Sequence, residues 1–319
     1  MTTLTERLEE YLVVRRSLGY DLSFTARVLR VFTAFADRES ADHITVDLFL
    51  RWKQCFGKAS NNTWLTRLGM VRGFAGWLQA EDARTEVPPA GLIAGKLRRS
   101  RPYIYSEKEV AEIVSRAAKL PSRYGMRGWT CSTLFGLIAV TGLRINEAIA
   151  LDDRDVDLAE GVVTVRHGKN GTARYVPLAP STVGRLRAYR AERSRLFGPT
   201  PDPFFLIEGG TRPTDCCARY NFALVSQKLG LRKPQRFCRH GRGPRIHDLR
   251  HTFAVRTIIG WYRKGLDPDR EMIKLSTYLG HAKPELTYWY IEAVPELLQL
   301  ASKRAERALA AGTSEGDVR

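Results

Sequence analysis

The sequence predicts a mainly helical protein of two domains that also contains one small β-hairpin. Apolar residues recur at helical spacing through most of the 319 residues. A segment rich in proline, glycine and basic residues interrupts this pattern at 83–104. An Asn-Gly dipeptide at 170–171 stands between two runs that alternate apolar and polar residues, which indicates a tight hairpin turn.

Four helices are predicted in the first 80 residues. Thr3 and Glu6 form a capping-box pattern ahead of the first helix, and Gly19 stands where that helix should end. Ser23 opens the second, and the runs VDLFLRWKQCF and NNTWLTRLGMVRGFAGWLQ predict the other two. We expect the large aromatic residues of these runs to pack in the core rather than on bases: Trp52, Trp64, Phe74 and Trp77.

The run EVPPAGLIAGKLRRSRPY predicts an extended linker, because adjacent prolines and scattered glycines oppose a helix. Ser106 and Glu109 then form a second capping-box pattern, so a new domain should begin near residue 105. The predicted division is a helical domain at 1–85, a linker at 86–104 and a second domain at 105–319.

The second domain should contain one fully buried helix and the hairpin. WTCSTLFGLIAVTG is apolar nearly all round and ends at Gly142, which places Arg144 just beyond the helix end. VVTVRHG and TARYVPL should form a two-stranded ribbon with Lys169 at its tip. The remainder after residue 180 is predicted to be mainly helical, with breaks near 197–204 and 231–244.

The charge of the chain predicts a polyanionic partner. The net charge is +17 and the sequence pI is near 9.9. Residues 228–250 hold eight basic residues against one acid, a density typical of nucleic-acid-binding surfaces. The sequence contains no run of about 18 apolar residues, and its first ten residues lack a signal-peptide core, so we expect a cytoplasmic protein.

The cysteines favour reduced, structural thiols over a disulfide framework or a metal site. Their number is five, and their spacing fits no disulfide pattern. A zinc set can be drawn from four side chains, but an adjacent Cys pair and a Cys-x-His do not match the usual spacing of zinc ligands. That disfavoured set is Cys216, Cys217, Cys238 and His240.

The run RIHDLRHTFAVR, residues 245–256, combines an apolar stripe with a polar face. At helical spacing Ile246, Leu249 and Phe253 fall on one side. His247, Arg250 and His251 fall on the other, where an imidazole and a guanidinium can bind the same anion. A zinc peptidase is the alternative, because His-x-x-x-His occurs in one family of such enzymes. It is disfavoured, since Asp248 is shorter than the required glutamate and a cation between the ligands opposes metal binding.

Four motifs in order then resemble the tyrosine recombinase, or phage integrase, family. They are TGLRINEAIAL at 141–151, HGKNGTARYVPL at 167–178, HDLRHTFA at 247–254 and YLGHAKPELTYWY at 278–290. The last segment, STYLGHAKPELTYWYIEA, resembles transposon-borne integrases in particular. The resemblance implies a four-helix SAM-like core-binding domain followed by an α+β catalytic domain, and a site-specific recombinase that integrates, excises or resolves a mobile element in the nucleoid.

The resemblance also implies a role for each motif residue. Two arginines would clamp the scissile phosphate, a lysine would protonate the leaving oxygen, two histidines would contact the phosphate, and a tyrosine would be the nucleophile. In that order these residues are Arg144, Arg250, Lys169, His247, His281 and Tyr290, with Glu147 supporting the first arginine. Tyr288 and Tyr278 compete with Tyr290, but its nine-residue spacing from His281 favours Tyr290.

The residue types suit this chemistry independently of the family. Arginine forks bind phosphate oxygens bidentately and stay charged at working pH. A tyrosine nucleophile splits strand cleavage into two steps and retains the bond energy in a covalent link. The scheme therefore needs no metal, cofactor or ATP, and the sequence contains no GxxxxGK[ST] loop.

Duplex DNA carrying recombination sites is the expected partner. The basic residues expected on DNA are Arg98, Arg99, Arg101, Arg239, Arg242 and Arg245. The resemblance implies a homotetramer, with a dimer on each site, in which the helix predicted at 295–311 docks on a neighbour; the alternative is that this helix packs on its own domain. Two other functions remain open, a type IB-like topoisomerase and a DNA-binding accessory protein that does not cleave.

Overall fold

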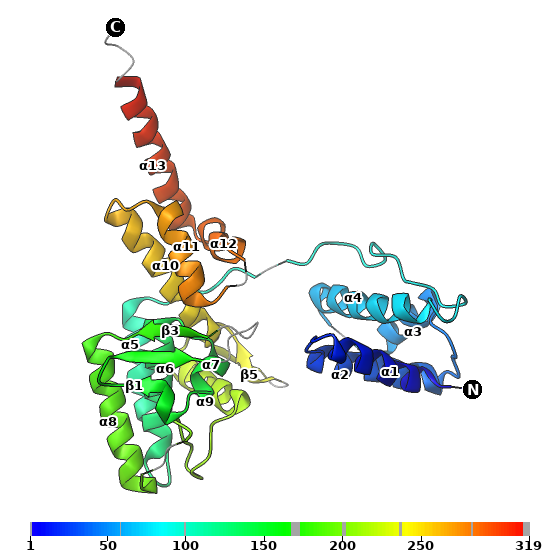
Figure 1. The fold of residues 1–319 in the computed structure, drawn as a ribbon, viewed down its shortest axis with the longest axis horizontal. Helices are drawn as coiled ribbons and strands as arrows, with labels where there is room; N and C mark the ends of the chain where they lie inside the picture. Colours follow the sequence, from blue (N-terminus) through cyan, green and yellow to red (C-terminus); the bar gives the residue numbers. More distant parts are fainter. Residues whose placement is uncertain are drawn as a thin grey trace. The chain divides into compact units, whose positions relative to one another are not determined.

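The computed structural model divides into two compact units, Met1–Ser100 and Arg101–Arg319 (Figure 1). The residues whose structure is described are 2–57, 59–98, 100–166, 173–199, 202–235, 238–281 and 283–314. None of the helices in these ranges combines the length and the apolar character that a membrane span requires.

The first unit is a bundle of four helices, as predicted. They are α1 (Leu4–Ser17), α2 (Ser23–Arg38), α3 (Val46–Cys55) and α4 (Asn61–Leu78). Thr3 and Glu6 form the predicted capping box at the start of α1. The expectation for the aromatic residues is confirmed, because Trp52, Trp64 and Phe74 are buried and Trp77 packs against the same core while partly exposed.

The chain after α4 forms no helix or strand in its described residues before α5 (Glu107–Ala118). Its first part is tied to the four-helix unit rather than free. Glu86 N–H donates to the Ile44 carbonyl at 2.7 Å, and Asn61 Nδ2 donates to the Ala94 carbonyl at 2.8 Å. Ile93 is buried in the core of that unit.

The second unit is built around a buried helix, α6 (Met126–Thr141), which ends at Gly142 in the left-handed conformation as the sequence predicts. The elements that follow it are α7 (Ile145–Ile149), the 3-10 turn Asp153–Asp155, α8 (Pro180–Phe197) and α9 (Asp215–Lys228). The helices that complete the unit are α10 (His247–Arg263), α11 (Pro268–Leu279), α12 (Glu285–Ala293) and α13 (Pro295–Ser314).

The predicted hairpin is present, but the sheet has a third strand. Antiparallel strands β2 (Val162–Val165) and β3 (Arg174–Pro177) pair with Val163 opposite Val176. A two-residue strand, β1 (Val156–Asp157), joins the outer edge of β2. The prediction of a two-stranded ribbon was therefore incomplete, because two residues give no alternation that a sequence pattern can reveal.

A second hairpin corrects the expectation of a mere break at 231–244. Strands β4 (Lys233–Gln235) and β5 (Cys238–Arg242) are antiparallel. Neither has the β-branched and aromatic composition typical of strands. Arg232 instead fixes the hairpin, because its guanidinium donates to the carbonyls of Gly241 and Gly243 at 2.8 and 3.0 Å.

Candidate active site

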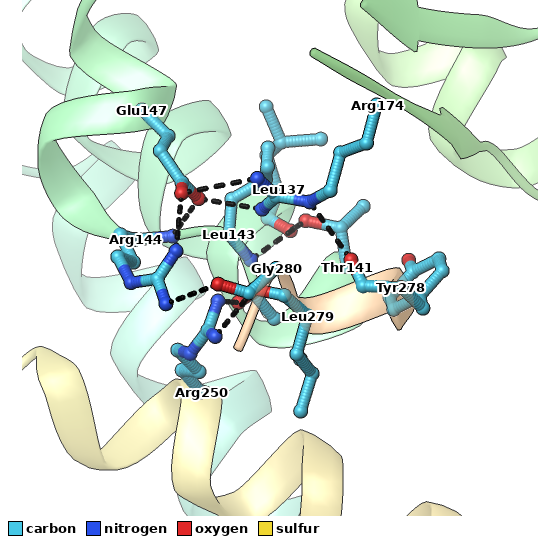
Figure 2. Close-up of polar contacts among 11 residues, drawn as sticks. Leu137, Thr141, Leu143, Arg144, Glu147, Arg174, Arg250, Tyr278, Leu279 and Gly280 are labelled. Atoms are coloured by element: carbon cyan, nitrogen blue, oxygen red, sulfur yellow. Dashed lines mark hydrogen bonds and ion pairs between the residues drawn. The ribbon is translucent and has the colours of Figure 1, made fainter. Parts of the chain in front are cut away.

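Two arginines from distant parts of the chain are held by the same short stretch of backbone. Arg250, on α10, donates from Nη1 to the Gly142 carbonyl and from Nη2 to the Leu279 carbonyl, each at 2.7 Å. Arg144 donates from Nη2 to the Gly280 carbonyl at 2.9 Å. Figure 2 shows both guanidinium groups directed at the Leu279–Gly280 segment.

The carbonyls that bind these arginines lie at the ends of helices. Gly142 follows α6 and Gly280 follows α11, and both have a left-handed backbone with φ of 65° and 64°. A helix C-terminus presents unsatisfied carbonyls and a partial negative charge, which favours a cation. The two helix ends therefore hold Arg250 without a carboxylate and hold Arg144 from one side.

Glycine is favoured at both helix ends by conformation, and at Gly142 by space as well. A Cβ at Gly142 would lie 2.6 Å from Cδ1 of Phe253, and a Cβ at Gly280 would lie 3.0 Å from Nη1 of Arg174. L-residues with side chains also rarely adopt a positive φ. Any substitution would push on the groups that surround the arginines.

One buried carboxylate, Glu147 of α7, holds two arginines. Arg144 Nη1 donates to its Oε1 at 2.6 Å, and Arg174 Nη2 donates to its Oε2 at 2.7 Å. Burial acts to raise the pKa of Glu147, but the hydrogen bonds from Arg174 and Arg144 and the charge of Arg174 outweigh burial and lower it. Glu147 is therefore ionised at neutral pH and fixes Arg144 from the side opposite Gly280 (Figure 2).

Arg250 is almost completely buried, with 1% of its surface exposed. Burial and the positive charge of Arg144 lower its pKa to about 10, while the charges of Tyr290 and Glu147 act in the opposite direction. The sequence predicts that the polar face of α10 can bind an anion. Two of its residues, Arg250 and His251, are buried, because α6, α11, α12 and α13 all pack on α10.

The histidines of α10 connect the arginines to Tyr290. The rings of His247 and His251 meet edge to face with centroids 4.6 Å apart, and His251 Nδ1 lies 2.9 Å from the Tyr290 hydroxyl. Burial first, and then the charges of Arg250, Arg245 and Arg144, lower the pKa of His247 to about 4. His247 is therefore neutral at neutral pH in the absence of a bound anion.

His281 directly follows the Gly280 carbonyl that binds Arg144. Its Nδ1 lies 2.7 Å from Oγ1 of Thr287, a fully buried residue of α12. Thr287 precedes Tyr290 by one turn of the same helix. Helix α12 therefore fixes the His281 ring and carries Tyr290 as well.

The two competing tyrosines lie in different surroundings. Tyr288 is 36% exposed and its hydroxyl donates to Asp269 at 3.4 Å. Tyr278 stacks on Phe253 with ring centroids 5.6 Å apart, and burial raises its pKa to about 12. Of these three tyrosines, Tyr290 is the one whose hydroxyl contacts a histidine of α10.

The structure thus brings the following predicted residues into one region: Arg144, Glu147, His247, Arg250, His281 and Tyr290. Lys169 and Arg99 lie outside the described residues, as does the side chain of Arg239. The other basic residues expected on DNA are exposed: Arg98, Arg101, Arg242 and Arg245.

The sequence did not identify two residues of the site, and it assigned no partner to a third. Arg174 lies on β3 two residues before the buried Val176, so strand alternation could have shown that it faces inward. His251 was placed on the correct helix face but given no partner. Thr287 carried no signal beyond its place one turn before Tyr290.

The zinc alternatives gain no support from the described residues. In those ranges no three side chains of His, Cys, Asp or Glu gather as metal ligands. Cys216 is exposed and Cys217 half-buried, whereas the side chains of Cys238 and His240 lie outside the described part.

Two known proteins with similar sequences carry the names of recombinases. A putative integrase/recombinase of Sinorhizobium fredii, y4rB, is 39% identical over 312 residues, which cover 96% of this chain and 98% of that protein. The tyrosine recombinase XerC of Chromobacterium violaceum is 27% identical over 236 residues, which cover 72% of this chain and 69% of XerC.

Solved structures confirm the predicted fold class. The Tn1549 transposon integrase in complex with transposon right end DNA matches with a TM-score of 0.67 and 16% identity, over 96% of this chain and 99% of that one. A lambda integrase dimer bound to a COC' core site matches with a TM-score of 0.63 and 17% identity, over 89% and 97%. Residues 105–296, which contain the whole site, match the phage integrase family. The chain is a member of the phage integrase family of tyrosine recombinases.

Proposed function

We propose that the chain is a site-specific DNA recombinase that cuts and rejoins duplex DNA through a 3′-phosphotyrosine link at Tyr290. The observation that carries the proposal is the pair of arginines on the Leu279–Gly280 backbone, with the Tyr290 hydroxyl 2.9 Å from His251, the residue that follows Arg250 on α10. Residues 105–319 would form the catalytic domain, residues 86–104 the linker, and residues 1–85 the core-binding domain that holds the duplex.

The arginines would bind the non-bridging oxygens of the scissile phosphate. The two carbonyl bonds of Arg250 occupy two of the roughly five N–H donors of a guanidinium, so it can keep its position and still bind an anion. His247 and His281 would donate to the same phosphate. Positive charge on preorganised donors stabilises the transition state, and removing one such donor typically slows a reaction by about 10²–10³-fold.

Cleavage would form one bond to phosphorus and break another. The Tyr290 oxygen attacks the phosphorus, the 5′ oxygen of the next nucleotide leaves, and Lys169 gives that oxygen its proton. The phosphodiester is replaced by a phosphotyrosine diester of the same charge. Rejoining is the reverse reaction with a 5′-hydroxyl of the partner strand, so the scheme uses neither metal nor ATP.

The test is a covalent trap on DNA. A target sequence is selected by binding the full chain to a random duplex pool, and the selected site is then nicked so that cleavage releases a short fragment. Wild type should form an SDS-resistant adduct in the presence of EDTA, Tyr290→Phe should form none, and the matched control Tyr288→Phe should behave as wild type. Loss of the adduct in Tyr288→Phe alone would assign the nucleophile to Tyr288.

The same substrates separate the alternatives. A strand-exchanged product at the selected site supports a recombinase, whereas relaxation of plasmids without site preference supports a topoisomerase. Binding without any adduct supports an accessory protein. Four single variants test the exposed arginines. If the side chain replaced with glutamine contacts a phosphate, the slope of log binding constant against log salt should decrease in magnitude by about one. The four positions are Arg98, Arg101, Arg242 and Arg245.

The active assembly would be a homotetramer on two sites in the nucleoid, with α13 docking on a neighbour. Leu297, in the first turn of α13, is fully buried in its own domain, while residues 302–306 are exposed. Removal of residues 301–319 therefore spares the core and should retain DNA binding and cleavage while abolishing strand exchange. Full strand exchange by this truncated chain would rule out docking through α13.

A further inference from the structure

His251 is a buried imidazole that the reaction above does not use. It is 5% exposed, and its Nδ1 lies 2.9 Å from the hydroxyl of Tyr290, which is 1% exposed. The Trp289 ring packs edge-on against the imidazole with centroids 5.8 Å apart. The proposed nucleophile therefore meets a potential proton acceptor within the protein.

We infer that His251 is the general base that takes the phenol proton of Tyr290 during cleavage. The inference rests on the proposed function. As the Tyr290 oxygen bonds to phosphorus, its O–H bond breaks and the proton moves to Nδ1 of His251, which becomes an imidazolium. In the rejoining step His251 returns that proton to the departing phenol oxygen, so the cycle leaves both residues unchanged.

The chemistry needs such an acceptor. An ordinary phenol has a pKa near 10, so only about 0.1% is ionised at pH 7. A donor–acceptor separation of about 2.6–3.2 Å is the range for direct proton transfer, and the His251–Tyr290 pair lies within it. Arg144 and Arg250 cannot accept a proton, and Lys169 is assigned to the opposite task of protonating the leaving oxygen. His247 and His281 are assigned to the phosphate oxygens, whereas His251 lies at hydrogen-bond distance from the Tyr290 hydroxyl.

The groups around His251 permit this role. Tyr290 of α12 and His247 of α10 are the titratable side chains whose contacts with it are described, and Arg250 adjoins it in the sequence. Because burial and the neighbouring arginines lower the pKa of His247 to about 4, His247 adds no charge that would oppose protonation of His251. The imidazolium formed would lie beside the newly formed phosphotyrosine diester, whose negative charge stabilises it.

The test compares rates of adduct formation in a single turnover on the nicked duplex across pH 6–9. His251→Asn keeps a polar group near the Nδ1 position but removes the base, and we expect it to be slower by about 10²-fold or more at neutral pH. The rate deficit of His251→Asn relative to wild type should shrink about tenfold for each unit by which the pH rises, since hydroxide replaces the missing base. His251→Gln serves as a second variant in case the first folds poorly.

Thr252→Val is the matched control. Thr252 is the next residue of α10, is equally buried and accepts from the Tyr105 amide at 3.0 Å. Its loss disturbs the same helix without touching Tyr290, so the pH dependence should keep its wild-type shape.

A second substrate distinguishes nucleophile activation from assistance to the leaving group. When sulfur replaces the 5′ bridging oxygen, the leaving group needs no proton, so the Lys169→Ala deficit should shrink and the His251→Asn deficit should persist. Three results would each overturn the inference. Both His251 variants could react at the wild-type rate, their rate deficit could be independent of pH, or the sulfur substrate could restore their rate. An adduct in Tyr290→Phe would instead overturn the proposed function itself.

Discussion

Replacing Glu147 with glutamine should destabilise the 101–319 unit far more than the loss of a surface ion pair. Glutamine keeps the volume of the side chain and creates no cavity, so the change removes the charge and replaces one acceptor oxygen with an NH2 donor. Four hydrogen bonds converge on the carboxylate: one from the Arg144 amide, one from the Arg144 guanidinium and two from Arg174. The side chains of Glu147 and Arg174 are only 4% and 11% exposed.

The expected loss follows from what remains after the change. Removing one partner of a buried ion pair typically costs about 3–5 kcal/mol, because the other charge stays buried without compensation. Arg144 is 23% exposed and can regain water, whereas Arg174 cannot. Only one buried arginine is left unpaired, and the amide oxygen of glutamine keeps part of its hydrogen bonding. The expected loss of stability is therefore at the lower end of this range, about 3 kcal/mol.

Urea unfolding of the full chain, followed through the transition of the 101–319 unit, measures this loss. Glu192→Gln is the matched control, because Glu192 also forms two hydrogen bonds with an arginine, Arg195, whose side chain is 65% exposed. The control should change the free energy of unfolding by less than about 1 kcal/mol. In the double variant Glu147→Gln/Arg174→Met the buried charge is gone, so its loss should be smaller than the sum of the single losses. A loss of under 1 kcal/mol for Glu147→Gln would refute the reasoning.

Three further changes test other parts of the site. The pKa of His247 in the folded protein is about 4, below its ordinary value of 6.5. The folded protein is therefore at full stability with respect to His247 above pH 6.5, and it loses stability as the pH falls toward 4, because the unfolded chain binds the proton first. The urea midpoint of His247→Asn should fall less steeply than that of wild type over this range. Gly280→Ala should cost about 1–3 kcal/mol of stability by strain at positive φ and slow adduct formation, because its Cβ would displace Arg174. Thr287→Val should slow adduct formation about fivefold at unchanged DNA affinity by releasing His281, since the lost hydrogen bond is worth roughly 1 kcal/mol. Thr287→Ser should restore the rate.

The parts of the site that local patterns specify could be predicted from the sequence. The end of α6 at Gly142 and the place of Arg144 follow from an apolar run that stops at a glycine. The β2–β3 pairing follows from alternation on both sides of Asn170-Gly171. These features depend on a few neighbouring residues, and no distant contact overrides them.

The contacts that hold the arginines could not be predicted in this way. Arg250 is fixed by carbonyls from residues 142 and 279, and a backbone carbonyl has no signature in the sequence because every residue carries one. The ion pair between Arg174 and Glu147 joins a strand to a helix 27 residues away, so it depends on how the sheet packs. The β4–β5 hairpin was missed for a similar reason, since the buried Arg232 stabilises it in place of strand-forming residues.

The choice of carbonyls over carboxylates has a consequence for the charge of the site. Arg144 and Arg174 form ion pairs with the single carboxylate of Glu147, whereas Arg250 is held by carbonyls, so these four groups together carry a net charge of +2. A separate carboxylate for each arginine would hold them as firmly but would cancel the charge that a phosphate must meet. Helix ends supply oriented partial charges only, so they fix the geometry and leave the positive potential available. The five-coordinate transition state of a phosphodiester carries more negative charge on its non-bridging oxygens than the ground state does. In the proposed reaction, a site with two uncancelled positive charges would therefore favour the transition state more strongly than bound DNA.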